Sequence, residues 1–347
     1  MEFKHQPWDL AQMQSLPLEA KIRMTQQRIR IWYEHWEGQV YVSFSGGKDS
    51  TVLKHIVDGM YDDVPALFIN TGLEYPEIQK FAMSQKNVVT VRPEMRFDEV
   101  IKKYGYPVIS KEVAVKISET RSCPGGYASQ SFNPNSPKIQ KYGSRFDLSR
   151  WAFLLDSPFL ISNKCCNVMK KNPAKQYEKQ TKRKAIIGTM ASESKARKTV
   201  WEKHGCNAFD QKRPTSQPLS FWTEQDVLHY IKKYNVPYCS VYGDIVVGEK
   251  VDGENILEGQ TNIIDYLGEY SEQDTLVTTG CSRTGCVFYA FGCHLEAEPN
   301  RFQRLKETHP RQYEYCIGGG EMVNGKWQPN KDGLGLGKVL DYINVPY

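Results

Sequence analysis

Residues 40–50 read VYVSFSGGKDS, an apolar run that ends in a cluster of glycine, serine, lysine and aspartate. Residues 40–44 alternate in hydrophobicity as a short buried strand does. Gly46 and Gly47 permit a tight turn with positive φ, and Ser50 begins a stretch with the look of a helix start. A strand, a glycine turn and a helix N-terminus expose unpaired backbone N–H groups at the positive end of the helix dipole. The stretch therefore predicts an anion-binding loop.

The side chains of this loop add to its chemistry. Lys48 supplies a positive charge, and the hydroxyls of Ser45 and Ser50 supply further donors. The stretch is not the common P-loop, because GxxxxGK[ST] requires glycine at Val42 and serine or threonine at Asp49. The carboxylate of Asp49 instead suits Mg²⁺, the ion that accompanies phosphates. The alternative interpretation is an ordinary glycine turn between a strand and a helix.

The hexapeptide SGGKDS resembles the PP-loop of the ATP pyrophosphatases, which split ATP between its α and β phosphates. The resemblance implies ATP and Mg²⁺ as ligands, with Lys48 and Asp49 as catalytic residues. The residues of this stretch that it assigns to the nucleotide are Ser43, Ser45, Gly46, Gly47, Lys48, Asp49 and Ser50.

Strand-like and helix-like segments alternate after the loop. Apolar runs at 66–71 and 88–91 read as strands, and 76–85 between them reads as a helix. This rhythm predicts an α/β fold with a doubly wound parallel sheet, as in adenine nucleotide alpha hydrolase-like proteins of the PP-loop type. Ligands lie at the carboxyl ends of such strands, so Thr71 and Gly72 form a second candidate loop for the nucleotide. A plain strand-to-helix turn is the equally weighted alternative there.

A later strand-like run, 185–189, ends in Gly188 and Thr189 and is followed by Arg197. An arginine at the end of such a strand could grip a phosphate in a bidentate manner, which lysine does less well. Gly188 and Arg197 therefore join the predicted nucleotide-binding residues. The preceding basic run, with eight Lys or Arg from Lys164 to Lys184, is interpreted mainly as a solvated helix face.

Composition places the chain among ordinary globular proteins. It has 347 residues, 40% of them hydrophobic, and a net charge of +5, which permits anionic partners without requiring nucleic acid. No run of about 18 apolar residues and no apolar N-terminal segment is present, so we expect a cytoplasmic protein that does not span a membrane.

The chain is expected to divide into three parts: an N-terminal helical segment over 1–38, a nucleotide-binding core over 39–220 and a cysteine-rich region over 221–347. Residues 122–146 are rich in Ser, Gly, Pro and Asn and predict a long loop, either a lid or a disordered segment. Residues 243–274 carry nine Asp or Glu against one Lys and predict an insertion, whose surface could serve a protein partner.

The nine cysteines are an odd number, and five of them cluster in two places, residues 165–166 and 281–293. In a reducing compartment such clustering favours a zinc or iron–sulfur site over disulfides, with buried hydrophobic cysteines as the alternative. Tyr289 stands where the second cysteine of a CxxC pair would be. The candidate metal ligands are Cys165, Cys166, Cys281, Cys286 and Cys293.

From about Val40 to Tyr289 the chain resembles the phosphoadenosine phosphosulfate reductase family, a branch of the PP-loop ATP pyrophosphatases. The features that match are the glycine loop, Cys165-Cys166, Gly188-Thr189 with Ser194 and Arg197, Pro218-Leu219 before Trp222-Thr223, and Pro237-Tyr238 with Tyr242. In members with a [4Fe–4S] cluster, the tandem cysteines and a later CxxC supply the ligands. The resemblance thus implies Cys165, Cys166 and Cys286 as ligands, with Cys281 or Cys293 as a replacement for the missing one.

Whether three or four thiolates bind stays open at this point. Four thiolates make a closed cluster, whereas three leave one iron open to sulfide or substrate, as in cluster-dependent thiolating enzymes that resemble this chain.

Two departures from the resemblance concern the reaction. Sulfonucleotide reductases attack with a cysteine in a C-terminal Glu-Cys-Gly-Leu-His-like tail, whereas this sequence has no cysteine after Cys316. A complete SGGKDS loop is typical of relatives that use ATP. We therefore expect an ATP-dependent sulfurtransferase that adenylates an acceptor, releases pyrophosphate and inserts sulfur from a donor.

The acceptor implied by the resemblance is a tRNA base or a DNA backbone, and the basic run from Lys164 is consistent with either. Two alternatives remain: a reductase of phosphoadenylyl sulfate or adenylyl sulfate, and a non-catalytic nucleotide-binding regulator.

Overall fold

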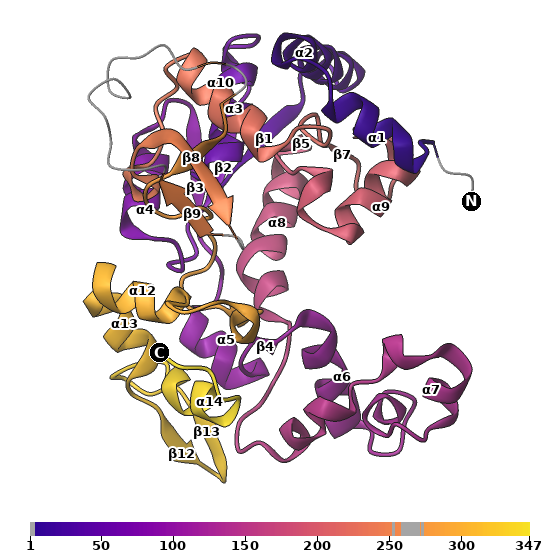
Figure 1. Ribbon diagram of the computed structural model, residues 1–347, viewed down its shortest axis with the longest axis vertical. Coiled ribbons are helices and arrows are strands. Elements are labelled where there is room, and N and C mark those ends of the chain that lie inside the picture. Colours follow the sequence, from indigo (N-terminus) through magenta and orange to yellow (C-terminus); the bar gives the residue numbers. More distant parts are fainter. Residues whose placement is uncertain (1–3, 252–253, 258–270, 272–273) are drawn as a thin grey trace. The chain divides into compact units, whose positions relative to one another are not determined.

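The computed structural model describes residues 4–251, 254–257, 271 and 274–347 (Figure 1). The chain divides into two compact units that interleave in sequence. The first unit comprises residues 1–70, 74–91 and 174–284, and the second comprises 71–73, 92–173 and 285–347. The three-part division expected from the sequence stays a prediction.

A six-stranded sheet forms the centre of the first unit, in the order β3-β2-β1-β5-β7-β6. All neighbours are parallel except β6, which runs antiparallel to β7. The predicted α/β fold with a mostly parallel sheet is confirmed. The strands are β1 (Val40–Phe44), β2 (Ala66–Ile69), β3 (Val88–Val91), β5 (Lys184–Ile187), β6 (Asn207–Ala208) and β7 (Thr215–Ser216).

Helices cover both faces of this sheet, because alternate residues of its strands are apolar on each side. On one face, Val42 packs in a core with Trp32 and Val52 from two helices. On the other face, Tyr41 packs with Tyr177 from a third helix. The helices with residues in this unit are α1 (Pro7–Gln14), α2 (Leu18–His35), α3 (Lys48–Asp58), α4 (Pro76–Ser84), α8 (Asn172–Thr181), α9 (Lys195–His204) and α10 (Glu224–Lys233).

A buried ion pair joins α2 to the start of α10. The Nζ of Lys21 lies 2.7 Å and 2.8 Å from the two carboxylate oxygens of Asp226, and both side chains are buried. One carboxylate oxygen also accepts from the backbone N–H of Thr223, the N-cap of α10. The pair thus fixes α10, whose first residue lines the pocket described below.

Replacing Asp226 with alanine is expected to lower the free energy of unfolding by about 3–5 kcal/mol, because Lys21 is left buried and uncompensated. The shift of the urea midpoint measures this loss. Asp62→Ala, at an exposed position, is the matched control and should cost less than about 0.5 kcal/mol. A loss below 1 kcal/mol for Asp226→Ala would contradict the role given to the pair.

The segment predicted as an acidic insertion contributes two strands, β8 and β9, to a three-stranded antiparallel sheet in the order β10-β8-β9, and β10 follows the segment in the chain. The strands of this sheet are β8 (Ile245–Val251), β9 (Glu254–Leu257) and β10 (Leu276–Thr278). The rest of the predicted insertion, residues 252–253, 258–270 and 272–273, lies outside the described residues.

The second unit is mainly helical. Its strands form a parallel pair, β4 (Val108–Ile109) with β11 (Ala290–Phe291), and a hairpin, β12 (Glu321–Val323) with β13 (Lys326–Gln328). Its helices are α5 (Phe97–Tyr104), α6 (Lys111–Ser122), α7 (Pro137–Tyr142), α12 (Arg301–Thr308), α13 (Pro310–Ile317) and α14 (Leu336–Tyr342).

The prediction of a long loop over 122–146 is wrong. This stretch forms α7 and two short 3₁₀ segments, Ser129–Phe132 and Ser144–Phe146. Ser136 caps α7 by accepting from the N–H of Ile139, and Pro137 occupies the first turn. Helices this short carry no readable periodicity, so composition alone misled the prediction.

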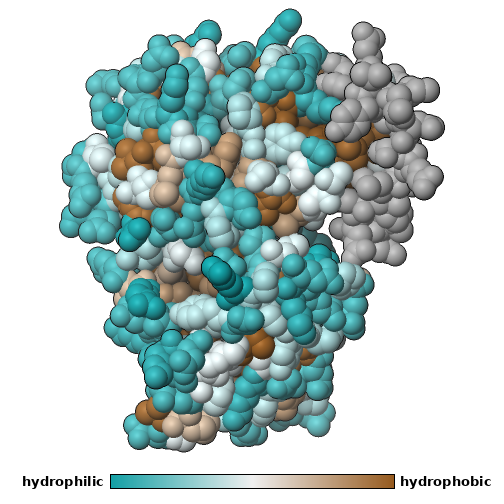
Figure 2. Space-filling view, turned by 90° about the vertical axis from the view of Figure 1, so that its left-hand side faces the viewer, coloured by the Kyte–Doolittle hydropathy of each residue, from teal (hydrophilic) through white to brown (hydrophobic). Residues whose placement is uncertain are grey.

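None of the described helices combines the length and the apolar character needed to cross a lipid bilayer. On the face of the molecule drawn in Figure 2, hydrophilic residues predominate and hydrophobic residues form smaller areas between them.

Candidate functional site

The predicted anion loop lies between β1 and α3. Gly47 is the N-cap of α3, which begins at Lys48. Gly46 has φ +74°, and a Cβ there would lie 2.9 Å from Cγ2 of Ile78. Only glycine satisfies both the backbone conformation and the close packing, so Gly46 gives the loop its sharp turn.

Serine hydroxyls hold the loop in shape. The Ser50 hydroxyl accepts from the backbone N–H of Ser45 at 3.1 Å and donates to the carbonyl of Gly47 at 2.9 Å. The Ser45 hydroxyl lies 3.0 Å from that of Ser50. These two side chains therefore shape the loop in the structure, where the sequence had suggested direct donors to a ligand.

A pocket of about 450 Å³ opens at this loop within the first unit. Its walls come from the loop, from the segment after β5, from the first residue of α10 and from two later segments of the chain. The lining residues are Ser45, Gly47, Lys48, Asp49, Met190, Glu193, Glu224, Tyr242, Arg283 and Thr284.

Lys48 is buried and bonded in this pocket. Its Nζ donates to the carbonyl of Ser282 at 2.7 Å and lies 3.0 Å from Oε1 of Glu224. Its backbone N–H donates to the hydroxyl of Tyr242 at 3.1 Å, and that hydroxyl also lies 2.7 Å from the hydroxyl of Thr284. An anion that binds Lys48 must therefore compete with the carboxylate of Glu224.

Asp49 is the residue best suited to a cation. Its Oδ1 is buried and has no hydrogen-bond partner among the described residues. Burial raises the pKa of this carboxyl group, and the nearby carboxylate of Glu224 raises it further, while Lys48, Arg283 and Arg197 oppose the shift. A buried acceptor without a partner is costly, and a bound divalent cation would satisfy it. The residues present therefore fit Mg²⁺.

Gly188 and Arg197 both lie in the first unit with the loop. A Cβ on Gly188 would lie 3.1 Å from the carbonyl oxygen of Asp49, so glycine lets β5 end against the loop. Arg197 forms an ion pair with Glu193, which lines the pocket. Burial and the proximity of Arg283 lower the pKa of Arg197.

The remaining predicted nucleotide residues lie elsewhere. Ser43 is within β1, in register with Leu67 of β2, and is absent from the described pocket lining. Thr71 and Gly72 belong to the second unit. Thr71 is buried, and its hydroxyl accepts from the N–H of Leu73 at 3.1 Å, which is the geometry of a local turn.

A second pocket, of about 270 Å³, lies within the second unit and gathers three of the predicted metal ligands. Apart from one lysine, its other described walls are apolar or aromatic, and no carboxylate is among the described lining residues. The lining residues are Leu73, Phe97, Cys165, Cys166, Met169, Lys170, Cys286 and Tyr289.

The two adjacent thiols differ in their protonation. The Cys165 thiol donates to Sγ of Cys166 at 4.0 Å, and this bond raises the pKa of Cys165, which burial raises further. The same bond lowers the pKa of Cys166 to about 6, with support from Lys111 and the lysines at 170 and 171. Of the two thiols, Cys166 is thus the one whose thiolate form, the form that binds metals, is favoured.

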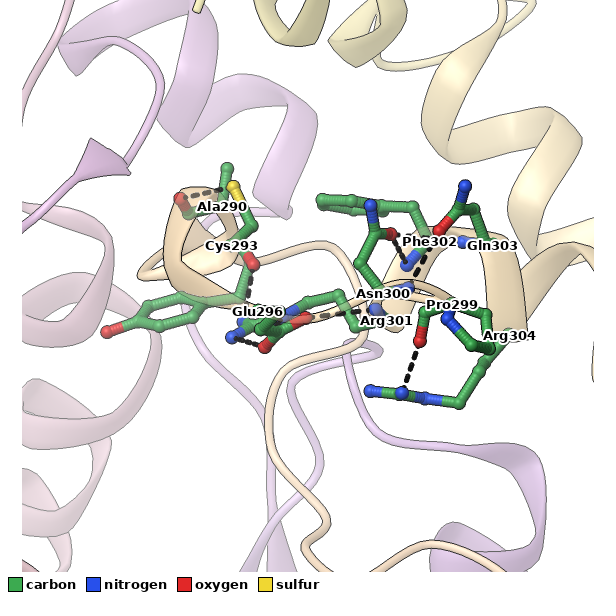
Figure 3. Close-up of polar contacts among 10 residues, drawn as sticks. Ala290, Cys293, Glu296, Pro299, Asn300, Arg301, Phe302, Gln303 and Arg304 are labelled. Carbon is green, nitrogen blue, oxygen red and sulfur yellow. Dashed lines mark hydrogen bonds and ion pairs between the residues drawn. The ribbon is translucent and has the colours of Figure 1, made fainter. Parts of the chain in front are cut away.

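Cys293 lies in the second unit but outside the lining of this pocket. Its thiol donates to the carbonyl of Ala290 at 3.0 Å, as Figure 3 shows. Burial raises its pKa to about 11. Beside it, Arg301 pairs with Glu296 and donates to the carbonyl of Tyr289 at 2.8 Å, which fixes the segment after Cys286.

Cys281 belongs to the first unit, so the five predicted cysteines do not form one group within either unit. Within the described part of the chain, no group of three or more His, Cys, Asp or Glu has an arrangement that could hold a metal ion. The chemistry of the second pocket nevertheless fits a sulfur-ligated cluster, because three thiols face one largely apolar space without competing carboxylates.

Comparison with known proteins assigns the family. The phosphoadenosine phosphosulfate reductase domain matches residues 39–115 and 131–293, which is more than half of the chain. The chain belongs to the phosphoadenosine phosphosulfate reductase family. The range matched by this family contains the glycine loop, both halves of the cysteine pocket and most residues that line the loop pocket.

Two curated proteins similar to this chain are uncharacterized proteins of Methanocaldococcus jannaschii. One is 35% identical over 86 residues, which cover 23% of this chain and 21% of the relative. The other is 26% identical over 218 residues, which cover 62% of this chain and 35% of the relative. The chain thus spans about a fifth and about a third of the lengths of these relatives.

Solved structures with similarity to this family member include three proteins. Phosphoadenylyl-sulfate reductase from Candida auris has a TM-score of 0.36 and 14% identity, covering 69% of this chain and 92% of that one. FMN adenylyltransferase from Candida glabrata in complex with ATP has a TM-score of 0.35 and 11% identity, and the match covers 67% of this chain and 64% of that one. The U34-tRNA thiolase NcsA from Methanococcus maripaludis with its [4Fe-4S] cluster has a TM-score of 0.33 and 15% identity, and the match covers 63% of this chain and 66% of that one. We draw no conclusion about function from these low scores.

Sequence reasoning missed several residues of the loop pocket in this family member. Glu224, Arg283 and Thr284 line it although they lie far from the loop in the chain. Glu224 stands in the sequence as one of several acidic residues after Thr223, and Arg283 lies between Cys281 and Cys286 without a pattern of its own. No local pattern could have found them, because their position depends on the tertiary fold.

Proposed function

We propose that this member of the phosphoadenosine phosphosulfate reductase family is an ATP-dependent sulfurtransferase that uses an iron–sulfur cluster. The observation that carries the proposal is the buried, unpartnered Oδ1 of Asp49 beside Lys48 in a pocket formed at a complete SGGKDS loop. The three thiols of the second pocket supply the reason to connect this ATP chemistry with sulfur.

In the proposed reaction, an oxygen of the acceptor attacks the α-phosphorus of ATP, and the bond to the β-phosphate oxygen breaks. Pyrophosphate leaves, and the acceptor carries AMP on its oxygen. A hydrosulfide-class donor then displaces AMP, so that sulfur replaces oxygen without net oxidation or reduction. Gly46, Gly47 and Lys48 stabilise the charge of the leaving pyrophosphate, and Asp49 would hold a Mg²⁺ ion, which would add positive charge beside the phosphates.

Cys165, Cys166 and Cys286 are the residues that would hold a [4Fe–4S] cluster, with Tyr289 as a fourth, non-thiol wall of the pocket. A bound cluster supplies iron, to which a sulfur atom can be coordinated. Cys293 donates to a carbonyl, and neither Cys293 nor Cys281 is among the described residues that line this pocket, so the proposal assigns three thiolates. The proposed location is the reducing cytoplasm, where thiols stay available as cluster ligands.

The acceptor is proposed to be a nucleic acid, either a tRNA base or a DNA backbone. The alternative of a sulfonucleotide reductase needs a thiol that can attack. Cys316 does not fit this need, because it is fully buried and burial raises its pKa. Sulfite released from phosphoadenylyl sulfate in the presence of thioredoxin would favour the reductase over our proposal.

The direct test is pyrophosphate release by anaerobically purified protein with ATP, Mg²⁺, sulfide and either unmodified tRNA or DNA. We expect pyrophosphate, AMP and sulfur-containing nucleic acid in equal amounts. If ATP binds tightly but none of these products forms with any acceptor, the protein is better described as a nucleotide-binding regulator.

Replacing Glu224 with glutamine is expected to tighten the binding of ATP in the presence of a metal chelator. Glu224 competes with phosphates for Lys48, and glutamine keeps the shape of the side chain while removing its charge. The expected gain is about fivefold, equivalent to ~1 kcal/mol. Calorimetric titration measures it, with the exposed Glu34→Gln as control. Unchanged or weaker ATP binding would show that this carboxylate does not compete.

A further inference from the structure

Residues 123–153 of the second unit follow α6 and contain α7 and short 3₁₀ segments, and we call them the 123–153 lobe. Arg121, just before the lobe, binds the segment that follows it. Arg121 donates to the carbonyls of Leu154, Leu155, Ser157 and Phe159 at 2.7–3.0 Å. Because these donors bond to carbonyl oxygens, the contact anchors the lobe rather than neutralising a carboxylate.

Inside the lobe, Lys138 is buried and donates to the hydroxyl of Ser131 at 2.6 Å. Its Nζ lies 4.5 Å from the centre of the ring of Tyr127 and 5.8 Å from that of Phe146. These contacts hold two aromatic rings around one cation, so the rings are placed by the fold. The positions of these rings on the lobe are therefore fixed by contacts within the lobe.

Aromatic rings are exposed on this lobe to an unusual degree. Tyr127 is 61% exposed, Tyr142 51% and Phe153 42%. Large aromatic side chains usually bury most of their surface, since each contributes strongly to a core. Three exposed rings within 31 residues point to a partner with which rings can stack.

Cations accompany these rings along the chain. Lys141 lies 5.1 Å from the ring centre of Tyr142, and Arg150 lies 5.0 Å from that of Trp151. Arg145 is exposed, as are Lys141 and Arg150. The lobe contains four Lys or Arg against one acidic residue, Asp147.

The combination distinguishes between kinds of partner. A protein partner that covers exposed aromatic rings would favour a largely apolar patch with few charges at its centre. In this lobe an arginine or lysine lies beside each of several rings. This pattern is typical of proteins that bind single-stranded nucleic acid, in which aromatic rings stack on bases and cations bind the phosphates. A duplex hides the faces of its bases and offers little to exposed rings.

We infer that the 123–153 lobe binds single-stranded nucleic acid and presents the acceptor of the sulfur-transfer reaction. The inference rests on the proposed function for the identity of the acceptor, but the binding itself does not require ATP or a cluster. Tyr142 stacks on a base, and Arg145 contacts a phosphate.

The test is fluorescence anisotropy with a labelled single-stranded oligonucleotide of mixed sequence, prepared as RNA and as DNA, and with the corresponding duplex, over a series of salt concentrations. Tyr142→Ala is expected to weaken binding about five- to a hundredfold, whereas Tyr142→Phe keeps the ring and binds as the wild type does. Arg145→Ala should lower the slope of log affinity against log salt by about 0.7. Lys331→Ala, an exposed lysine of the same unit, is the charge control.

Equal affinity of Tyr142→Ala, Arg145→Ala and wild type would overturn the inference, as would a preference for the duplex. A dimer that Tyr142→Ala dissociates, without oligonucleotide binding, would identify the surface as a contact between copies of the chain and also overturn it. Lys48→Ala should bind the oligonucleotide normally. If binding follows the lobe but pyrophosphate is never released, the proposed function fails and this inference stands.

Discussion

Replacing Asp49 with asparagine is expected to reduce ATP-dependent pyrophosphate release by at least about a hundredfold. The substitution keeps the size of the side chain and removes the carboxylate whose buried Oδ1 has no partner among the described residues. In the proposed reaction this oxygen holds Mg²⁺, so both the affinity for Mg²⁺ and the turnover fall. Pyrophosphate release at a series of Mg²⁺ concentrations measures both effects.

The same substitution is expected to stabilise the fold at neutral pH. The folded state raises the pKa of Asp49, chiefly by burial, so the folded protein binds a proton at this site more tightly than the unfolded chain does. The free energy of unfolding therefore decreases as the pH rises from the unfolded pKa of about 3.9 through the raised folded pKa. Asparagine cannot ionise, so the advantage of Asp49→Asn appears across this window and persists above it.

Turnover of the wild type should respond to pH through the same group. A proton on Asp49 excludes Mg²⁺, so pyrophosphate release should fall with decreasing pH at a value above the ordinary range of aspartate. Asp62→Asn, which removes an exposed carboxylate of the same unit outside the pocket lining, is the control for general effects of charge. A variant Asp49→Asn that is less stable than the wild type yet fully active would contradict both the burial argument and the metal role.

Four of the six strands in the sheet of the first unit were predictable, because they are short apolar runs bounded by glycine or polar residues. The two-residue strands β6 and β7 were not predicted, since so short a run carries no pattern. Residues 40–44 and 88–91 were predicted as the structure has them, and 66–71 differs only at its end. The helix at Leu18–His35 was predictable for a similar reason, since its apolar residues recur with helical spacing. Such patterns depend only on residues close together in the sequence, so the sequence alone predicts the elements that they form.

The surroundings of the glycine loop were not predictable in this way. Lys48 bonds to a carbonyl 234 residues further along the chain. Only the family resemblance marked Tyr242, and nothing marked Glu224 as a competitor for the lysine. These contacts depend on how distant segments pack, which hydrophobic periodicity does not encode.

The cysteines show the same limit in a sharper form. Spacing nominated five cysteines, and the structure brings Cys165, Cys166 and Cys286 to one pocket. Cys281 is only five residues from Cys286, yet the two belong to different units. Spacing along the chain thus does not show which cysteines belong to the same compact unit.

Replacing Cys286 with serine is expected to reduce iron and acid-labile sulfide to background after anaerobic purification. Serine retains the shape of the side chain but cannot supply the soft thiolate that an iron–sulfur cluster requires. Cys165→Ser and Cys166→Ser should behave alike, because their thiols line the same pocket. Iron and sulfide analysis, together with visible absorption, measures the loss.

Cys293→Ser and Cys281→Ser separate the proposed three-thiolate site from a four-thiolate one. Cys293 donates to a carbonyl and lies outside the pocket lining, so its serine variant should retain iron. Cys123→Ser, at an exposed position, is the matched control. Loss of iron in Cys293→Ser would require a rotation of that side chain and would add a fourth ligand.

Sulfur transfer and adenylation should respond differently to the cysteine variants, because the loop pocket and the cysteine pocket lie in different units. We expect Cys286→Ser to bind ATP with wild-type affinity while forming no sulfur-containing product. Lys48→Ala should show the reverse, with full iron content and impaired ATP binding. Zinc in place of iron in the wild type would reject the cluster, and an active, iron-free Cys286→Ser would show that sulfur transfer does not depend on it.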